Sequence, residues 1–216
     1  MHNCSLQWVT PNAEQQIIDI ARVSTNKPKG EPGEKLLAYL IEHKHWSPFE
    51  MVDMCLEVKT TRDISHQMVR HRSFFFQEFS QRYSEVDSAF SFTNARYQHP
   101  TNKQLSIETT EDSYLGLTWN SIQANVCKHA VDGYLDARHY GVAKEVARKI
   151  LPEGMTPTRL FMKGNCRNWI HYIEARTYEG AQLEHRLVAQ SAKKIFIGQF
   201  PTLAKVLYKD GDVESK

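Results

Sequence analysis

Apolar residues recur at intervals of three and four along much of this chain, which is the spacing of one face of an α-helix. The segment 34–44 shows the pattern clearly, because Leu36, Leu37, Leu40 and Ile41 fall on one side. The pattern therefore predicts a protein in which helices dominate. The expected helices are 11–24, 34–44, 62–72, a long helical region at 108–140 that is broken or bent near Gly133, 142–150, 165–176 and 179–199.

Two other segments carry the shorter period of a strand. One is short and is expected at 158–162, and the other begins at Glu50. In the second, one side of a half-buried strand is formed by Val52, Met54, Leu56 and Val58.

The remaining stretches connect these elements. The polar segment 87–106 predicts a long loop, and the tail from Asp210 is expected to fray. Because strands are few and helices many, the expected fold class is α+β. We expect a single domain over residues 1–216, with a small, mainly antiparallel sheet flanked by several helices, including the long central helical region.

The densest polar cluster lies at 70–83, where three arginines, a histidine and a carboxylate are interleaved with four phenylalanines. So many charged groups are hard to bury without an anionic partner. The cluster therefore predicts a pocket for a phosphorylated ligand that contains a ring. The alternative is a helix end whose cations favour the helix dipole, followed by a core strand.

The local geometry of this cluster is also predictable. Arg70 to Arg72 are expected to end a helix, and the chain beyond Phe74 to be extended. With a period of two, one face of that strand presents Glu78, Ser80 and Arg82. The other face, from Phe75 to Tyr83, is expected to anchor the strand in the core.

The composition of the chain argues against several classes of function. The chain has 27 basic and 25 acidic residues, a balance too even for binding long nucleic acid through an overall field. Its four cysteines form no C-x-x-C pair, so we expect buried, reduced thiols in a cytoplasmic protein. No apolar run is long enough for a membrane span, and no signal-peptide pattern is present. Neither a glycine-rich nucleotide fingerprint nor a metal-ligand cluster is found, so a dinucleotide would be held by arginines and polar side chains.

One family matches these residues. Arg70-His71-Arg72 is followed by seven residues and then Ser80, and the chain resembles the flavin-dependent thymidylate synthases, whose signature has this spacing. Glu78, Arg82 and Tyr83 also stand at the family's places. Further matches follow in the family's order: Ala21-Arg22-Val23-Ser24, His45-x-Ser47-Pro48-Phe49-Glu50, Ala147-Arg148-x-x-Leu151-Pro152, Asn165-x-Arg167, Arg176 and Ala181-Gln182-x-Glu184.

The resemblance implies an activity and a site. The family makes thymidylate from dUMP, with the methylene group from methylenetetrahydrofolate and reducing equivalents from NADPH through FAD, in a homotetramer whose active sites several subunits share. Carried over by position, the FAD contacts would be Ser47, Arg70, His71, Arg72, Glu78, Asn165, Arg167 and His171. The dUMP contacts would be Gln67, Arg70, Glu78, Ser80, Gln81, Arg82, Arg148 and Arg176.

The residue types agree with this chemistry. C5 of uracil becomes nucleophilic when negative charge builds on the ring, and a guanidinium stabilises the anion left when N3 loses its proton. Arg176 is expected to take that role. No cysteine stands in a motif, which agrees with the way the family differs from synthases that use a cysteine. Ser80 is expected to position the substrate, since no general base adjoins it. The chain departs from many members at Met51, Phe75, Gln77 and His171, where they have His, Ser, Asn and Asn.

Two other functions remain open from the sequence. A related enzyme could hydroxymethylate dUMP on the same scaffold. In a different class, a single-stranded nucleic-acid-binding module could stack bases on the aromatic residues of 70–83.

Overall fold

The structure is a computed structural model that describes residues 1–24, 28–30, 32–85 and 90–208. The tail that was expected to fray from Asp210 lies outside the described residues. A four-stranded sheet has the order β1-β2-β6-β3, and each pair of neighbours is antiparallel. The expected α+β class is therefore confirmed. The strands are β1 (Asn3–Val9), β2 (Asp53–Thr61), β3 (Phe75–Glu78) and β6 (Pro157–Asn165).

The centre of this sheet is the half-buried strand that alternation predicts. Val52, Met54, Leu56 and Val58 are fully buried, as expected. β2 itself begins only at Asp53, because Ser47–Met51 form the 3-10 turn η2 around Pro48. β6 is longer than the segment expected at 158–162, since it pairs with β2 over its whole length.

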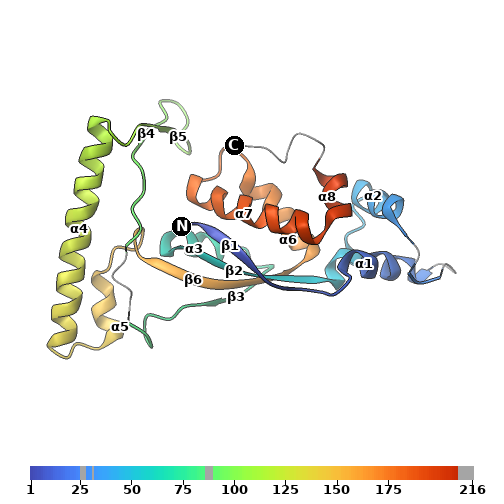
Figure 1. Cartoon of the computed structure of the whole chain (residues 1–216), viewed down its shortest axis with the longest axis horizontal. Coiled ribbons are helices and arrows are strands. Elements are labelled where there is room, and N and C mark those ends of the chain that lie inside the picture. The colour runs from blue at the N-terminus through green and yellow to red at the C-terminus, as the bar shows by residue number, and fades with distance from the viewer. Residues whose placement is uncertain (25–27, 31, 86–89, 209–216) are drawn as a thin grey trace.

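Two helices cover one face of the sheet, as Figure 1 shows: α6 (Cys166–Thr177) and α7 (Leu183–Gln199). Trp169 of α6 is fully buried between the layers, and its Nε1 donates a hydrogen bond to Met54 O at 3.0 Å. The interior therefore lies between this helix pair and β2 and β6. The other helices near the sheet are α1 (Ala13–Ala21), followed by the 3-10 turn η1 (Arg22–Ser24), α2 (Glu34–Glu42), α3 (Arg62–Met68) and α8 (Pro201–Leu207).

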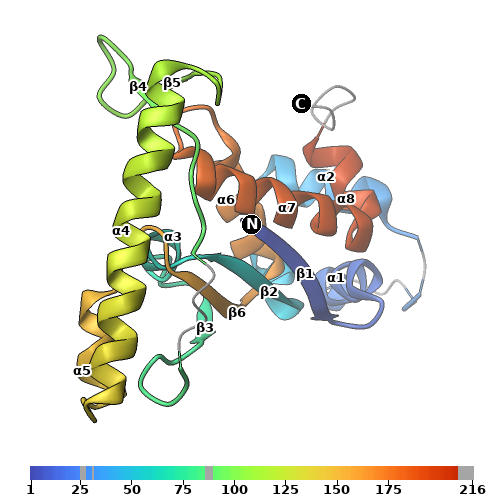
Figure 2. The same cartoon turned by 60° about the vertical axis from the view of Figure 1, so that its left-hand side comes forward.

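A long helix, α4 (Tyr114–His139), stands apart from the sheet (Figures 1 and 2). The expected break near Gly133 is wrong, because α4 runs through it. A Cβ on Gly133 would lie 3.2 Å from Ile150 Cδ1, so this glycine serves close packing instead. The segment expected as one helix at 142–150 is α5 (Lys144–Ala147) and the 3-10 turn η3 (Arg148–Ile150). Across the described ranges, we find no helix both long and apolar enough to span a membrane.

Of the segment 87–106, expected as a loop, residues 87–89 lie outside the described residues, and the remainder contributes to a small ribbon. β4 (Arg96–Gln98) pairs with β5 (Ser106–Glu108), so the loop prediction is wrong in part. Each strand has only three residues, which is too short for alternation to be recognised.

The segment 70–83 is folded differently from the expectation. α3 ends at Met68, and a turn follows, in which Phe74 N donates to His71 O at 3.1 Å. The extended part is only the four residues of β3, and a second turn begins where Tyr83 N donates to Ser80 O at 3.2 Å. Glu78, Ser80 and Arg82 therefore do not share one strand face.

The anchoring residues of β3 are also different. Phe75 and Tyr83 are 69% and 77% exposed, whereas Phe74 is buried and Phe76 packs against the core. Pairing with β6 explains this, because Phe76 stands opposite the buried Met162. Phe74 lies over Gly164, where an added Cβ would be 2.5 Å from its ring.

Candidate active site

Four of the expected site residues line one pocket of about 480 Å³: Gln67, Arg70, His71 and Arg176. Gln67 comes from α3, Arg70 and His71 from the turn after it, and Arg176 from the last turn of α6. The fold thus joins residues that are about a hundred positions apart in sequence. Two guanidinium groups in so small a space give the pocket the charge and the donors that suit an anion.

The centre of this pocket is a contact between Arg176 and His71. Arg176 Nε donates to His71 Nε2 at 3.0 Å. Burial, and then the charge of Arg176, lower the pKa of His71. The imidazole is therefore neutral near neutral pH, with its proton on Nδ1 and its Nε2 as acceptor. Arg176 keeps its charge and has its remaining N–H groups for a ligand.

Behind the pocket lies a buried polar group that sequence reasoning missed. His185 of α7 is fully buried, with its Nδ1 3.3 Å from Gln67 Oε1 and its Nε2 3.1 Å from Tyr172 OH. Burial, followed by the charges of Arg176 and His71, lowers the pKa of His185 to about 3. In a sequence, a histidine and a tyrosine at core-facing helix positions resemble packing residues. The sequence therefore did not indicate that His185 and Tyr172 lie behind the pocket.

Glu78 is held by three neighbours rather than left facing the pocket. Its Oε1 accepts from Ser65 Oγ at 2.8 Å and from Thr158 Oγ1 at 2.7 Å, and lies 3.5 Å from Arg62 Nη1. All three contacts use Oε1, so Oε2 takes part in none of them. The carboxylate is fixed in place with one oxygen left for a ligand.

Four of the eight residues expected at the flavin lie around η2 and on or next to α6: Ser47, Asn165, Arg167 and His171. Asn165 caps α6 by accepting from Asn168 N at 3.0 Å, and Asn168 Nδ2 donates to Ser73 O at 2.6 Å. This second bond ties the helix start to the turn that carries Arg72. Ser47 opens η2 and is exposed.

Two α6 side chains face η2. Arg167 Nη1 pairs with Glu50, and the ring of His171 meets Trp46 edge-on at 4.7 Å. Burial, then the charge of Arg167, lowers the pKa of His171, so this ring is neutral as well. Arg167 Nε is buried and has no hydrogen-bond partner among the described residues. A bound group with an acceptor oxygen or nitrogen would satisfy it, so these residues fit an anionic dinucleotide.

The other expected substrate residues form a second group near α5. Arg82 Nε lies 3.4 Å from Glu145 Oε2, and Ser80 Oγ accepts from Arg82 N at 3.3 Å. Gln81 is buried, and Arg148 begins η3. None of these four residues lines the pocket of Arg176. Among the described residues, the expected dUMP contacts therefore do not all line one pocket, and Glu78 is also absent from its lining.

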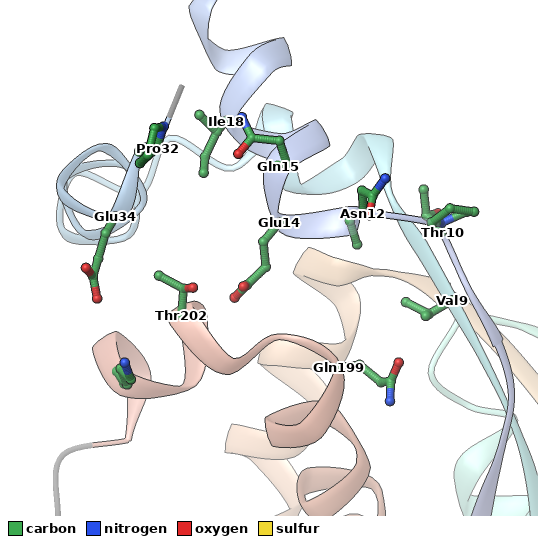
Figure 3. Close-up of a pocket in the computed structure, with 14 residues that line it drawn as sticks. Val9, Thr10, Asn12, Glu14, Gln15, Ile18, Pro32, Glu34, Gln199 and Thr202 are labelled. Atoms are coloured by element: carbon green, nitrogen blue, oxygen red, sulfur yellow. The ribbon is translucent and has the colours of Figure 1, made fainter. Parts of the chain in front are cut away.

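A larger pocket, of about 690 Å³, lies among β1, α1, α2 and α8 (Figure 3). Glu14 extends across it toward α8 and accepts from Leu203 N at 2.7 Å, which caps that helix. No residue of the expected site lines it. Through its bond to Leu203 N, Glu14 links α1 to α8.

Comparisons with known proteins identify the family of this chain. A family model described as "Thymidylate synthase complementing protein" matches residues 5–202. The probable flavin-dependent thymidylate synthase of Paramecium bursaria Chlorella virus 1 is 46% identical over 198 residues, covering 90% of each chain. The flavin-dependent thymidylate synthase of Synechocystis sp. is 46% identical over 187 residues, covering 87% of this chain and 86% of its own.

Solved structures show the same fold. The UMP/dUMP methylase PolB from Streptomyces cacaoi, bound with 5-Br dUMP, superposes with a TM-score of 0.85 at 25% identity, covering 98% of this chain and 96% of its own. These matches extend over almost the whole chain, including both halves of the pocket. The chain belongs to the flavin-dependent thymidylate synthase family. Its cofactor class is therefore a flavin.

Proposed function

We propose that this protein converts dUMP to dTMP by reductive methylation. Methylenetetrahydrofolate supplies the carbon, and NADPH supplies the reducing equivalents through FAD. The observation that carries the proposal is the pocket in which Arg176, held by His71, meets Gln67 and Arg70. These residues have the charge to bind a nucleotide phosphate or a uracil anion, and they stand at the family's motif positions.

Arg176 is the catalytic residue of this proposal. A guanidinium beside the uracil ring stabilises negative charge on N3 and its neighbours, which raises electron density at C5. The neutral ring of His71 accepts from Nε of Arg176 and so fixes the plane of the guanidinium. The rest of the dUMP site would be Gln67, Arg70, Glu78, Ser80, Gln81, Arg82 and Arg148.

The cysteines support a mechanism without a thiolate. Burial raises the pKa of all four thiols, to about 12 for Cys4 and well above the ordinary value for Cys166. A nucleophilic cysteine needs the opposite shift, because only the thiolate attacks. Since all four are free thiols, we include the cytoplasmic location expected from the sequence in the proposal.

The flavin would supply the transfer of reducing equivalents to the pyrimidine when bound. The protein's part is to bind and orient it. The guanidiniums of Arg70, Arg72 and Arg167 suit its diphosphate. Among the described residues, Arg167 Nε has no hydrogen-bond partner, so Arg167 has an N–H to donate to the flavin. The other expected contacts are Ser47, His71, Glu78, Asn165 and His171.

We include in the proposal a homotetramer whose active sites are shared between subunits, built from one domain over residues 1–216. The two separate groups of dUMP residues within one chain support sharing. Exposed apolar surface supports assembly. The sheet face away from α6 and α7 exposes Trp8, Phe75 and Phe161, and α4 exposes Leu117 and Ile122. Such surface is usually covered by a partner.

The test is product formation. Purified protein with FAD, dUMP, methylenetetrahydrofolate and NADPH should turn yellow with bound flavin and yield dTMP. Hydroxymethyl-dUMP as the product would instead support the related activity on this scaffold. A protein that takes up no FAD and forms neither product would contradict both.

A further inference from the structure

Glu184 ends a row of hydrogen bonds that leads to Gln67. Its Oε1 lies 2.7 Å from Arg96 Nη2, and its Oε2 accepts from Gln182 Nε2 at 3.0 Å. Burial works against ionisation, but hydrogen bonds to the backbone and to Arg96 outweigh it and lower the pKa of Glu184. Glu184 is therefore a carboxylate, which can only accept hydrogen bonds.

This charge sets the orientation of two amides in turn. Because Gln182 directs its nitrogen at Glu184, its oxygen faces Gln67. Gln67 Nε2 donates to that oxygen at 2.7 Å, so Gln67 Oε1 faces His185. An amide oxygen cannot donate, and the nitrogen of His185 opposite it must therefore carry the proton.

His185 completes the row in the same direction. With one proton on Nδ1, its Nε2 is an acceptor and takes the hydrogen of Tyr172 OH at 3.1 Å. Each donor along the row thus has one permitted direction, from Tyr172 through His185, Gln67 and Gln182 to Glu184. His185 and Tyr172 at one end of the row are buried, whereas Gln182 is exposed, so the row is held most firmly at His185.

We propose that His185 is a positioning residue that holds the amide of Gln67 in one orientation for the nucleotide. The inference rests on the proposed function, in which Gln67 binds dUMP. His185 and Gln182 occupy one lone pair and one N–H of the amide. Gln67 lines the pocket with Arg70 and Arg176, so its remaining lone pair and N–H are the groups that the proposal assigns to dUMP. Without His185, the amide keeps only its bond to Gln182 and is held less firmly for dUMP.

Two substitutions separate this role from simple packing. His185→Leu fills the space but leaves Gln67 Oε1 without its donor. His185→Asn keeps an amide N–H near the position of Nδ1, so it can still donate to Gln67. We expect His185→Leu to weaken dUMP binding to the flavin-loaded protein about three- to tenfold, the value of one hydrogen bond. Binding and KM for dUMP should change together, kcat should change little, and His185→Asn should restore most of the loss.

Tyr172→Phe is the matched control. It removes a hydroxyl of the same row but leaves the contact between His185 and Gln67, so dUMP affinity should stay within about twofold. Equal losses in Tyr172→Phe and His185→Leu would indicate a packing effect and overturn the proposal.

A second measurement uses the wild-type protein, so it does not depend on whether a variant folds. In protein labelled at the histidine ring nitrogens, NMR should show His185 protonated on Nδ1 and bare on Nε2 near neutral pH. The opposite tautomer would contradict the proposal.

If His185→Leu binds dUMP like the wild type, the positioning role fails while thymidylate synthesis stands. If the wild type binds no dUMP, the proposed function fails and this inference fails with it.

Discussion

Arg176 and His71 are joined by a single hydrogen bond, from Nε of the arginine to Nε2 of the histidine at 3.0 Å. The bond links the end of α6 to the turn after α3 and holds a cation at the wall of the pocket. It also requires a neutral imidazole, since a protonated ring has no acceptor nitrogen. The orientation of the Arg176 guanidinium, to which we assign the activation of uracil, therefore depends on the protonation state of His71.

Replacing Arg176 tests the role of that charge. Arg176→Ala should lower the rate of dTMP formation about a hundredfold or more, as the loss of an electrostatic stabiliser does, while flavin remains bound. Rates come from product assays, and bound flavin from visible absorbance. Arg159→Ala is the control, because Arg159 is half exposed and pairs with Glu57 on the open face of the sheet. Wild-type turnover in Arg176→Ala would exclude the proposed role.

Acid should weaken the reaction through His71. Its pKa lies below the ordinary 6.5, first because it is buried and then because Arg176 is near. Activity should therefore be level at and above pH 6.5. It should fall at lower pH, as His71 gains a proton and loses its acceptor nitrogen. His71→Gln keeps a side-chain acceptor that does not titrate. Its kcat/KM should therefore fall less than that of the wild type as the pH is lowered. A profile unchanged by this substitution would show that another group sets the acidic limit.

Sequence patterns predict the helices and the central strand well, for a physical reason. α2, α7 and β2 each bury one continuous face, and a buried face leaves a period in the chain. β1 was missed because it is an edge strand whose side chains are mostly exposed. α8 was missed because it starts at Pro201, although proline suits the first turn of a helix.

The site could be predicted only in part. Spacing draws attention to 70–83, but nothing local shows that Arg176 meets His71, since tertiary folding brings them together. Family resemblance assigned His71 to the flavin and Arg176 to dUMP, and the structure adds the contact between them. It did not supply His185 and Tyr172, which lie outside the matched motifs and are buried like core residues. The face assigned to Glu78, Ser80 and Arg82 was wrong because the strand ends at Glu78 and a turn follows.

The thiols should be dispensable for chemistry. Replacing Cys4, Cys55, Cys127 and Cys166 by alanine together should leave dTMP formation largely intact, because burial keeps all four protonated. Three of them are buried, so some loss of thermal stability is expected from the small cavities. Circular dichroism would confirm the fold. An inactive but folded variant would reopen cysteine catalysis.

His185 should make the fold sensitive to acid. Its pKa is about 3 in the folded protein and about 6.5 when unfolded, so the unfolded state binds the extra proton between these values. The free energy of unfolding should fall as pH falls through this window, by up to about 1.4 kcal/mol per unit from this group. Urea titrations of wild type and His185→Asn at several pH values isolate the effect. The wild type should lose more stability on acidification, and parallel losses would place the pKa of His185 near its ordinary value.

The separation of Arg176 from Arg148 leads to a test of shared sites. Arg176 lines the pocket with Gln67, whereas Arg148 lies on η3 beside α4 and is not among the described residues that line this pocket. Arg176→Ala and Arg148→Ala should each be nearly inactive alone. If one site takes Arg176 from one subunit and Arg148 from another, some sites in a mixed assembly regain both wild-type residues. Co-expression of the two variants with different tags, followed by purification on both, should therefore restore measurable dTMP formation. If both residues served a site within one chain, every site would keep one defect, and the mixed protein would stay as inactive as its parents.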